Sequence, residues 1–323
     1  MVQRPQQLMR QFARHGHPVF FCNLSQRRGA PPEAVEPNLT VIHDHERFLS
    51  HVAPDLRAPL VWCSWAKLHD RLAAYRPGAV LFDAVDDFPQ WRRFEPAMLR
   101  IADGVTASAA ALHERIRPHH PRVALLPNGC DFPFLSQPPA GGRPDDLPPP
   151  PVAGFVGAWA PWVDGRLLEQ VAGALPAWNF AIIGPLFGRR ELTAPNVHFL
   201  GYRPYSALPA YLHHLDVALL PFQRSQVTEA ANPVKLWEYL AAGLPVVATP
   251  LRELAAHQEL LFLAAQPGDF AAAIEAAGAD RGRDRTAARR ALAQQNDWSV
   301  RYRQVLSAFP DLFDPPGDGR GTP

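Results

Sequence analysis

Residues 232–249 read NPVKLWEYLAAGLPVVAT and follow an apolar run, VALLPF, at positions 217–222. Asn232 is a favourable N-cap, Pro233 suits the first helical position, and Gly243 suits the position just past a helix end. The apolar segment PVVAT that follows at once is typical of a buried strand. The stretch therefore predicts a strand, a loop, a helix and a second strand, which is the repeating unit of a parallel α/β sheet.

The start of this predicted helix is suited to a phosphorylated ligand. In such a unit the helix N-terminus lies at the carboxyl edge of the sheet, where free N–H groups and the positive dipole end attract phosphate. Lys235 adds a formal charge there, and the carboxylate of Glu238 can accept hydrogen bonds from two vicinal ribose hydroxyls. A sugar nucleotide satisfies both features. The plain structural alternatives are a solvated Glu238 and Lys235, and an Asn232 that only caps the helix.

The same alternation of strands and helices runs along the whole chain. Before residue 138 the apolar runs read PVFFCNL, APLVWCSW, AVLFDAV, GVTAS and RVALLPNG, and after residue 150 they read VAGFVGAW, NFAIIGP, VHFLG, VALLPF and PVVAT. Helices are expected near residues 5–15, 69–76, 97–102, 109–116, 166–174 and 208–214. This pattern predicts an α/β fold with two Rossmann-like halves.

The domain boundaries follow from proline content, because proline cannot donate a backbone hydrogen bond and resists regular structure. The segment QPPAGGRPDDLPPPP is read as an exposed linker. The predicted organisation lists an N-terminal acceptor-side domain (1–137), a linker (138–150), a C-terminal nucleotide-sugar-binding domain (151–298), a helix returning to the first domain (299–314) and a frayed tail (315–323).

The N-terminal domain lacks an opening strand in the sequence. A Rossmann-like half begins with a strand, whereas the first predicted element here is the helix at 5–15. Two explanations stay open: the true start of the protein lies upstream of residue 1, or the sheet has lost a strand.

Composition and charge exclude several classes of protein. The 323 residues are 47% hydrophobic and 20% charged, which is ordinary for a folded chain of two domains. A net charge of +1 argues against a nucleic-acid-binding protein. Three cysteines without CxxC spacing indicate neither a zinc site nor a disulfide framework. With no apolar run near the roughly 20 residues of a membrane span and no secretion signal, a cytoplasmic protein is expected.

In their order and spacing, the motifs resemble a known family, the retaining glycosyltransferases of family 4, and particularly its bacterial cell-wall and exopolysaccharide branch. The resemblance covers nearly the whole chain and rests on QRPQQL, FDAVDDF, ADGVTAS, LLPNGCDF, GFVGAW with WVD, FAIIGP, NVHFLGYRPYSALPAYLHHLDVALLPF, NPVKLWEYLAAGLPVVAT and NDW. It implies the GT-B architecture, in which two Rossmann-like domains face a cleft.

The resemblance also implies an activity. A metal-independent hexosyltransferase would move a sugar from a nucleotide-sugar donor to a glycan or lipid-linked acceptor, with retention of configuration, in polysaccharide biosynthesis. No cofactor is expected, because the nucleotide-sugar is the substrate. The expected location is the cytoplasm, with peripheral contact at the inner face of the membrane left open.

Donor-binding roles fall on the C-terminal half. The branch shows an Asn-Pro-x-Lys-x-x-Glu pattern, which is matched by Asn232, Pro233, Lys235 and Glu238. Glu238 takes the place of the ribose-binding glutamate, and Lys235 is expected to stabilise the leaving diphosphate during catalysis. The first glutamate of the family motif has no match, because Ala230 stands in its place and Glu229 lies one residue too early.

The diphosphate needs further partners, since the Arg or Lys residues that follow the glycine-rich turn in many relatives are absent here. The nearest candidates are Arg166 and, after the strand at 217–222, Arg224. Gly157 can let a phosphate or the acceptor approach the backbone closely. Two nearby tryptophans, Trp159 and Trp162, are more often core or rim aromatics than sugar platforms.

The N-terminal half contributes acidic residues after the strand AVLFDAV. Asp86 stands where many relatives carry a sugar-contacting histidine, so we expect it to contact the transferred sugar or act as a base toward the acceptor. Asp87, Asn128 and Gly129 are acceptor-side or cleft candidates. The alternatives are that Asp86 or Asp87 caps a helix and that Asn128-Gly129 is only a turn dipeptide. No metal site is assigned.

Two other functions stay open. A sugar-nucleotide epimerase or dehydrogenase needs a GxGxxG fingerprint, and neither GFVGAW nor IIGPLFG has that spacing. A catalytically degenerate GT-B protein that serves as a binding or assembly partner is the main alternative, because the first motif glutamate, the first strand and the expected arginine are all missing.

Overall fold

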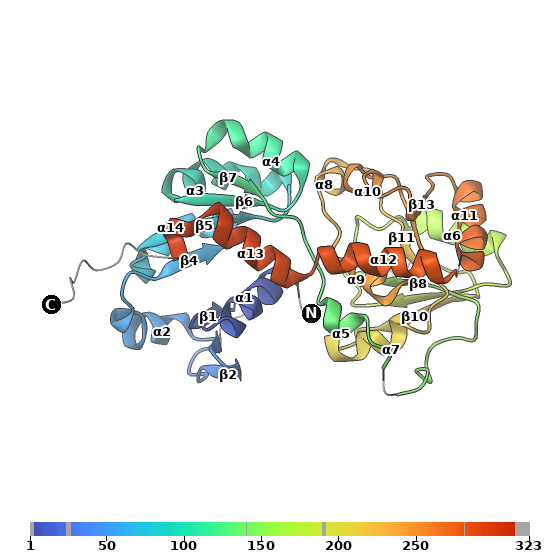
Figure 1. Cartoon of the computed structure of the whole chain (residues 1–323), viewed down its shortest axis with the longest axis horizontal. Coiled ribbons are helices and arrows are strands. Elements are labelled where there is room, and N and C mark those ends of the chain that lie inside the picture. The colour runs from blue at the N-terminus through green and yellow to red at the C-terminus, as the bar shows by residue number, and fades with distance from the viewer. Residues whose placement is uncertain (1–2, 24–26, 140, 189–191, 281, 314–323) are drawn as a thin grey trace. The chain divides into compact units, whose positions relative to one another are not determined.

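The structure is a computed structural model that describes residues 3–23, 27–139, 141–188, 192–280 and 282–313 (Figure 1). By internal contacts the chain divides into two compact units. The N-terminal unit contains Gln3–Pro127 together with the segment from Trp298 onward, and the C-terminal unit is Asn128–Asp297. Each unit is described by itself below.

The C-terminal unit is built on a six-stranded parallel sheet with the order β10-β9-β8-β11-β12-β13. Numbered within the unit, this order is 3-2-1-4-5-6, which is that of a doubly wound dinucleotide-binding fold. The strands are β8 (Val152–Val156), β9 (Asn179–Ile183), β10 (Val197–Gly201), β11 (Val217–Leu220), β12 (Val246–Ala248) and β13 (Leu261–Leu263).

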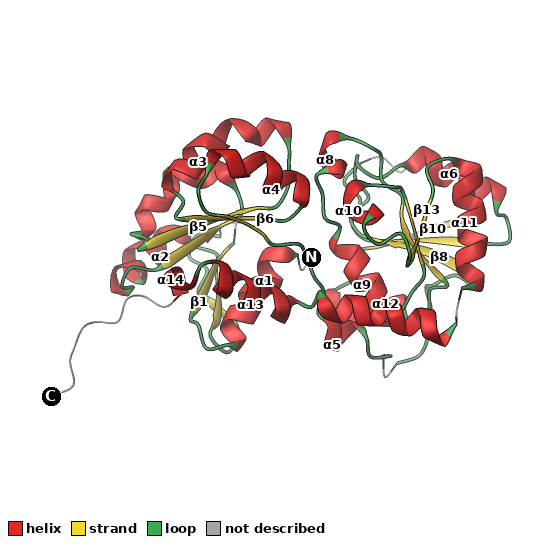
Figure 2. Ribbon diagram, turned by 45° about the horizontal axis from the view of Figure 1, so that its top comes forward, coloured by secondary structure: helices red, strands yellow, loops and turns green. Residues whose placement is uncertain are grey.

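Helices cover both faces of this sheet (Figure 2). Successive residues of a strand point to opposite faces, so Val152 and Val156 of β8 enter one core while Ala153 and Phe155 enter another. The first core is completed by α7 (Leu208–Leu212) and α9 (Val234–Ala242), and the second by α6 (Gly165–Ala174) and α11 (Pro267–Ala279). Burial on both faces explains the near-continuous apolar runs in the strand sequences. The unit also contains α5 (Phe132–Leu135), η5 (Tyr205–Ala207), α8 (Gln226–Glu229), α10 (Arg252–Ala255) and α12 (Arg283–Gln295).

The N-terminal unit has two sheets among its described residues. One is parallel with the order β4-β5-β6-β7, and the other has the order β1-β3-β2, in which β1 is parallel and β2 antiparallel to β3. The strands are β1 (Val19–Cys22), β2 (Glu33–Glu36), β3 (Leu39–Ile42), β4 (Leu60–Cys63), β5 (Ala79–Ala84), β6 (Gly104–Ala107) and β7 (Val123–Leu125). The helices are α1 (Arg4–Arg14), α2 (His45–His51), η1 (Ala53–Asp55), η2 (Ala66–Tyr75), η3 (Pro89–Phe94), α3 (Glu95–Ile101), α4 (Ala110–Ile116) and η4 (Arg117–His119).

The helices α13 (Trp298–Ala308) and α14 (Pro310–Phe313) belong to the N-terminal unit. Helix α13 packs against α1, where the rings of Phe12 and Tyr302 meet edge to face with centroids 4.9 Å apart. The helix predicted for 299–314 thus begins at Trp298 and is followed by a second short helix. Residue 314 and the predicted tail at 315–323 lie outside the described residues.

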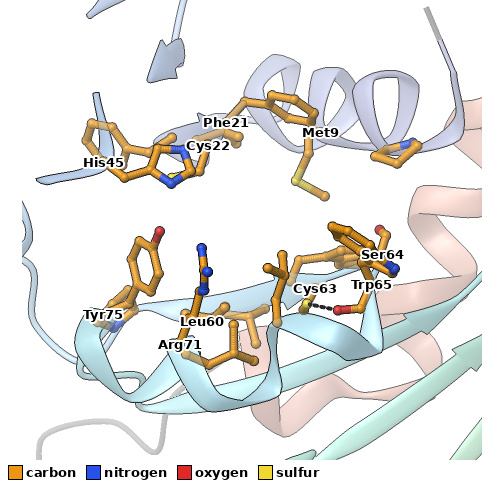
Figure 3. A pocket seen from close by; sticks show the side chains of 18 of the residues that line it. Met9, Phe21, Cys22, His45, Leu60, Cys63, Ser64, Trp65, Arg71 and Tyr75 are labelled. Carbon is orange, nitrogen blue, oxygen red and sulfur yellow. Dashed lines mark hydrogen bonds between the residues drawn. The ribbon is translucent and has the colours of Figure 1, made fainter. Parts of the chain in front are cut away.

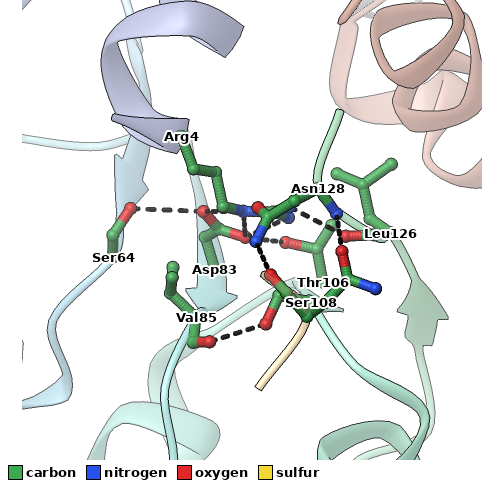
Figure 4. Close-up of polar contacts among 9 residues, drawn as sticks. Arg4, Ser64, Asp83, Val85, Thr106, Ser108, Leu126 and Asn128 are labelled. Atoms are coloured by element: carbon green, nitrogen blue, oxygen red, sulfur yellow. Dashed lines mark hydrogen bonds and ion pairs between the residues drawn. The ribbon is translucent and has the colours of Figure 1, made fainter. Parts of the chain in front are cut away.

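A buried polar cluster holds the start of α1 at the carboxyl edge of β5, β6 and β7 (Figure 4). Arg4 and Asp83 form an ion pair of 2.7 Å with exposed fractions of 1% and 0%. Thr106 and Ser64 donate hydroxyl hydrogen bonds to the same carboxylate, and a second guanidinium nitrogen of Arg4 donates to the carbonyl of Leu126 at 2.8 Å. Both oxygens of the buried Asp83 carboxylate therefore accept hydrogen bonds, as the burial of a charged group requires.

Most of the described residues of the Pro-rich segment 138–150, which leave out residue 140, are exposed, but the segment also makes contacts within the C-terminal unit. Leu147 is buried in the core of that unit, and Asp146 accepts from the Tyr211 hydroxyl at 2.8 Å and pairs with Arg203. The division between the units falls earlier, between Pro127 and Asn128. The reason for the difference is that proline prevents helix and ladder formation but still buries its ring and its apolar neighbours.

Several short elements escaped the sequence reading. The sequence analysis did not predict four elements, namely β2, β3, β13 and α2. Two of them lack a clear strand pattern, because β2 reads EAVE with mostly exposed residues and β13 is only three residues long. The helix expected near 69–76 is a 3-10 helix, η2, which ends at a left-handed Arg76 with φ of 49°.

Candidate functional site

The topological switch point of the C-terminal sheet lies between β8 and β11. These strands are neighbours, but the chain continues from β8 outward to β9 and from β11 outward to β12. Ligands of open α/β sheets bind outside the carboxyl ends of the strands at this position, because the two connections diverge and leave a crevice. Gly157 follows β8 directly, and Arg224 lies a few residues beyond β11.

The two loops at the switch point are hydrogen-bonded to each other. The Asp164 N–H donates to the carbonyl of Pro221 at 2.7 Å, and the Gln223 N–H donates to the carbonyl of Trp162 at 2.9 Å. This pairing continues the contact between the strands beyond their ends. These hydrogen bonds therefore hold the loops after β8 and β11, with the residues that they carry, in fixed positions relative to each other.

The two tryptophans of the first loop differ in environment. Trp159 is 5% exposed and meets Phe155 and Phe199 edge to face, so it belongs to the core. Trp162 is 36% exposed and lies at the rim.

Gly157 lies where two backbones approach each other closely. Its N–H donates to the carbonyl of Ile183 at 2.9 Å, and a Cβ at Gly184 would stand 1.8 Å from the Gly157 carbonyl oxygen. Gly184 also has a φ of +154°, which favours glycine. The close approach that the structure shows at Gly157 is thus to the backbone of Gly184. Ligand contact at Gly157 stays a prediction.

Helix α9 is anchored to the end of β8 by a tyrosine. The Tyr239 hydroxyl accepts from the N–H of Val156 at 2.8 Å and is fully buried. Burial raises the pKa of Tyr239, so the phenol stays protonated at neutral pH. This bond therefore also fixes the backbone of α9, which carries Glu238, relative to the switch point.

Lys235 and Glu238 form an ion pair on the first two turns of α9. Lys235 Nζ lies 2.6 Å from Glu238 Oε2, and the exposed fractions of the two side chains are 17% and 2%. A buried carboxylate needs a compensating partner, and Lys235 provides it. The pair stands at the N-terminus of a helix whose first N–H groups point toward the carboxyl edge of the sheet.

Asn232 does not cap α9, which corrects the sequence prediction. The N-cap is Pro233, and no side chain caps the helix. The Asn232 amide oxygen accepts from the Asn128 N–H at 3.0 Å and from Trp237 Nε1 at 3.1 Å, and its nitrogen donates to Glu253 at 2.9 Å. A side chain with these three contacts supports the loop before α9. A direct role of Asn232 and Pro233 toward the donor stays a prediction.

Asn128 and Gly129 open the C-terminal unit, and both are tightly packed. The Asn128 side chain donates back to the carbonyl of Asn232, completing a reciprocal pair. A Cβ at Gly129 would stand 2.4 Å from the carbonyl oxygen of Asn296. Both residues thus have structural contacts, and their acceptor-side role stays a prediction.

The two arginine candidates differ in their partners. Arg166 is exposed in the first turn of α6 and, within the described residues, forms no ion pair. Arg224 Nε donates to Glu229 at 2.8 Å, and the Glu229 carboxylate also accepts from the Arg252 N–H at 3.3 Å. The Glu229 carboxylate is therefore engaged by residues of its own unit. This agrees with its place in the sequence, one residue before the position of the first motif glutamate. Of these two arginines, Arg166 can turn to a diphosphate without giving up an ion pair with any residue that the structure describes.

Asp87 is held in an ion network of the N-terminal unit. The carboxylate is 5% exposed and pairs with Arg92 and with Arg115, and Arg115 also donates to Glu95 at 2.5 Å. The N-cap residue of the following 3-10 helix, η3, is Phe88, so Asp87 is not its N-cap. These contacts give Asp87 a structural role, and its acceptor-side role stays a prediction.

Asp86 has a different environment, next to the buried cluster of Arg4 and Asp83. Solvent reaches its side chain, but the protein atoms around it remove part of the hydration of the carboxylate. This desolvation and, second, the charge of Asp83 raise the pKa of Asp86 to about 6, against the opposing charge of Arg4. A carboxyl group with such a pKa can exchange a proton near neutral pH.

The raised pKa predicts a pH dependence of any activity that uses the Asp86 carboxylate. Below about pH 6 the group is protonated, and above it is ionised, so kcat/KM should rise as the pH increases through 6 and then level off. In Asp86→Asn this rise should be lost and the remaining rate should be lower at pH 8. Rate profiles of both proteins between pH 5 and 9 test this. An unchanged rise in Asp86→Asn would assign it to another group.

The sequence reasoning missed Gly184 and Tyr239. Gly184 ends the strand NFAII, where a glycine directly after a strand signals a close backbone approach. Tyr239 lies on a helix with apolar residues on almost every side, and a buried phenol needs a hydrogen-bond partner. Both patterns can be recognised in the sequence, but neither shows which residue Gly184 or Tyr239 contacts.

Residues 150–280 match the family of glycosyl transferases group 1. This part of the chain is similar to a glycosyltransferase group 1 domain. It contains the switch point, Lys235 and Glu238. The curated relative TuaH of Bacillus subtilis (strain 168), named as a teichuronic acid biosynthesis glycosyltransferase, is 29% identical over 235 residues, which are 66% of this chain and 58% of that protein. The match thus spans less than two thirds of the relative's length.

Solved structures show the fold of the whole chain. A glycosyltransferase from Rickettsia africae matches with a TM-score of 0.70 and 13% identity over 98% of this chain and 97% of that one. HepE of Anabaena, solved in complex with UDP-glucose, matches with a TM-score of 0.60 and 18% identity over 81% and 82%. The α/β, GT-B fold predicted from the sequence is confirmed. In the described part of the chain, no helix has the length and apolar character needed to cross a bilayer.

Proposed function

We propose that this protein is a glycosyltransferase that moves a sugar from a nucleotide-sugar donor to a glycan or lipid-linked acceptor during synthesis of a cell-envelope polysaccharide. The observation that carries the proposal is the position of Lys235 and Glu238 at the start of α9, beside the switch point of a group 1 domain. The proposed location is the cytoplasm, with contact at the inner face of the membrane if the acceptor is lipid-linked.

The ion pair suggests how donor binding proceeds. In the free protein Lys235 neutralises Glu238, and a bound donor would bring a second anion to Lys235 and two ribose hydroxyls to Glu238. Hydrogen bonds from the two ribose hydroxyls would then stabilise part of the negative charge of Glu238, so that Lys235 can turn toward the diphosphate. The N–H groups at the start of α9 and the guanidinium of Arg166 would add to this charge stabilisation.

For the reaction we propose retention of configuration, following the resemblance to the retaining family. The acceptor hydroxyl would attack on the face from which the nucleoside diphosphate leaves, while the bond from the anomeric carbon to the diphosphate breaks and the hydroxyl proton passes to an oxygen of the departing diphosphate. Negative charge develops on the leaving diphosphate, so donors fixed near it act mainly in the transition state.

Lys235→Ala should therefore lower kcat by at least about tenfold and raise the donor KM less, because charge-assisted contacts contribute roughly 1.5–3 kcal/mol. The change also removes the partner of a buried carboxylate, so thermal stability must be measured beside the kinetics. Lys235→Arg is the matched control, since it keeps the charge and the pairing with Glu238. Full turnover in Lys235→Ala would contradict the assigned role.

The function itself is tested with the purified chain. Thermal-shift screening against UDP-, GDP- and dTDP-sugars should raise the melting temperature with one donor, because a ligand that binds only the folded state stabilises it by mass action. Transfer to glycan or lipid-linked acceptors should then give a product with the anomeric configuration of the donor by NMR. An inverted product contradicts retention. Donor binding without turnover on any acceptor would favour the catalytically degenerate alternative.

A further inference from the structure

A small polar pocket of about 40 Å³ lies in the N-terminal unit, where the segments after β4 and β5 meet. These two strands are parallel neighbours, so their carboxyl ends lie at the same edge of the sheet. Ser64 and Trp65 line this pocket and also a separate apolar slot of about 1030 Å³ between β1 and β4 (Figure 3). The polar pocket is thus placed at the edge where Asp86 also lies.

Three half-buried aromatic rings line the pocket. Trp65 follows β4, and Phe88 and Trp91 follow β5. The ring centroids of Trp65 and Trp91 are 5.7 Å apart, and those of Phe88 and Trp91 are 4.6 Å apart, both in edge-to-face contact. The carbonyl of Trp65 accepts from the Cys63 thiol at 3.4 Å (Figure 3) and from the Leu68 N–H at 3.0 Å. These contacts hold the rings in place in the free protein.

Two polar groups of the pocket lack a partner in the part of the chain that the structure describes. Trp65 Nε1 is buried and donates to no acceptor. The Asp86 carboxylate forms neither an ion pair nor a hydrogen bond, whereas the other two carboxylates of the pocket, Asp87 and Glu95, are held by arginines. A buried N–H without an acceptor is costly, so the site favours a ligand that supplies one.

The chemistry of the pocket restricts the group that enters it. Sites for whole small molecules measure roughly 300–1,000 Å³, so a pocket of this size takes one substituent of a ligand rather than a sugar ring. That substituent must accept from an indole N–H and donate to the Asp86 carboxylate. A hydroxyl does both, whereas an ammonium group cannot accept and a carboxylate is repelled by Asp86. Phe82 and Ala84, which also line the pocket, suit the carbon that carries the hydroxyl.

We propose that this pocket binds the exocyclic hydroxymethyl group of a hexopyranose, which is the acceptor sugar if the proposed transfer function holds. The hydroxymethyl oxygen would accept from Trp65 Nε1 and donate to Asp86. The C–H face of the sugar ring would pack on the exposed part of Trp91. The site therefore selects an acceptor whose terminal sugar has a free hydroxymethyl group over one that ends in a 6-deoxyhexose.

The test measures sugar binding to the full chain through the NMR signals of the Trp65 and Trp91 indole N–H groups. The probes are the methyl glycosides of glucose, galactose and mannose, each paired with its 6-deoxy counterpart, which lacks only the hydroxyl. Trp65→Phe removes the proposed donor. Trp62→Phe is the matched control, because Trp62 on β4 also has a buried, unpaired Nε1 but does not line the pocket. Both changes delete an N–H without a partner, so both variants should fold.

At least one hexoside should shift both indole signals and bind at least about tenfold more tightly than its 6-deoxy counterpart, because the deoxy sugar leaves two polar groups of the site unpaired. In Trp65→Phe, followed through Trp91, this preference should fall to less than about threefold, since the indole donor is gone. It should persist in Trp62→Phe. Trp91→Ala, followed through Trp65, should weaken both members of a pair equally, because the ring face contacts both.

Three results would overturn the proposal. They are no response of the Trp65 signal to any of these sugars, equal binding of the hexosides and their 6-deoxy counterparts, and loss of the preference in Trp62→Phe. Donor binding is measured separately, as the rise in melting temperature with nucleotide sugars. A rise with a nucleotide sugar but no preference among the pairs would overturn the pocket alone. The preference without any such rise would support the sugar pocket and contradict the proposed transfer function.

Discussion

Glu238→Gln is expected to weaken nucleoside diphosphate binding by at least about tenfold. The Glu238 carboxylate is 2% exposed and is held by Lys235 at the start of α9. An amide accepts less strongly from two ribose hydroxyls than a carboxylate does, and each charge-assisted hydrogen bond contributes roughly 1.5–3 kcal/mol. The Gln side chain can still accept from Lys235, so the fold around α9 should persist. Isothermal titration with the diphosphate of the preferred donor measures the effect.

Glu229→Gln is the matched control for this experiment. Glu229 lies in the same unit and carries the same chemical change, but its carboxylate is engaged with Arg224 and the N–H of Arg252. Exposed pairs of this kind contribute about 0.2–1 kcal/mol, so less than about a fivefold change in affinity is expected. If both variants bound the diphosphate equally well, Glu238 would not be the ribose-binding residue.

Asp83→Ala should destabilise the N-terminal unit by about 3–5 kcal/mol, which is the usual cost of removing one partner of a buried ion pair. The change leaves the Arg4 guanidinium, 1% exposed, without its carboxylate, and it removes the acceptor of the Thr106 and Ser64 hydroxyls. Because Arg4 fixes the start of α1, we expect α1 to detach first. Chemical denaturation followed by hydrogen exchange of α1 amides measures both effects.

Two comparisons make this prediction specific to the buried cluster. Asp311→Ala breaks an exposed ion pair of the same unit, to Arg122, and should cost far less stability, because solvent screens a pair of this kind. The double variant Arg4→Ala/Asp83→Ala should be more stable than the sum of the single changes predicts, because it leaves no uncompensated charge. Equal losses for Asp83→Ala and Asp311→Ala would mean that the cluster is not the anchor of α1.

The strands of the C-terminal sheet other than the three-residue β13 were predictable because they are largely apolar, and that pattern depends on local sequence alone. The helix α9 was predictable for a similar reason, since its breakers Pro233 and Gly243 stand at its two ends. The exact role of Asn232 could not be predicted from the sequence. Its amide bonds Asn128 and Glu253, which are distant in sequence, and these contacts outweighed its intrinsic preference for an N-cap.

The paired acidic residues show the same limit in the N-terminal unit. Asp86 and Asp87 are adjacent in sequence and chemically identical. Asp87 lies within reach of Arg92 and Arg115 and is tied into an ion network, whereas Asp86 remains accessible and has its pKa raised to about 6. Composition and spacing cannot separate the two, because the difference arises from side chains that the fold brings together.

From its sequence alone this protein can be assigned an α/β fold and a phosphate-suited helix start at residues 232–238, because periodicity and helix breakers are local properties. The order of its motifs adds the resemblance that implies the GT-B architecture. Only the tertiary structure decided that Lys235 compensates a buried Glu238, that Leu147 of the Pro-rich segment enters the core of the C-terminal unit and that a slot separates β1 from β4. These features depend on which backbone and side-chain groups find partners across the fold, and burial makes each unpaired polar group costly.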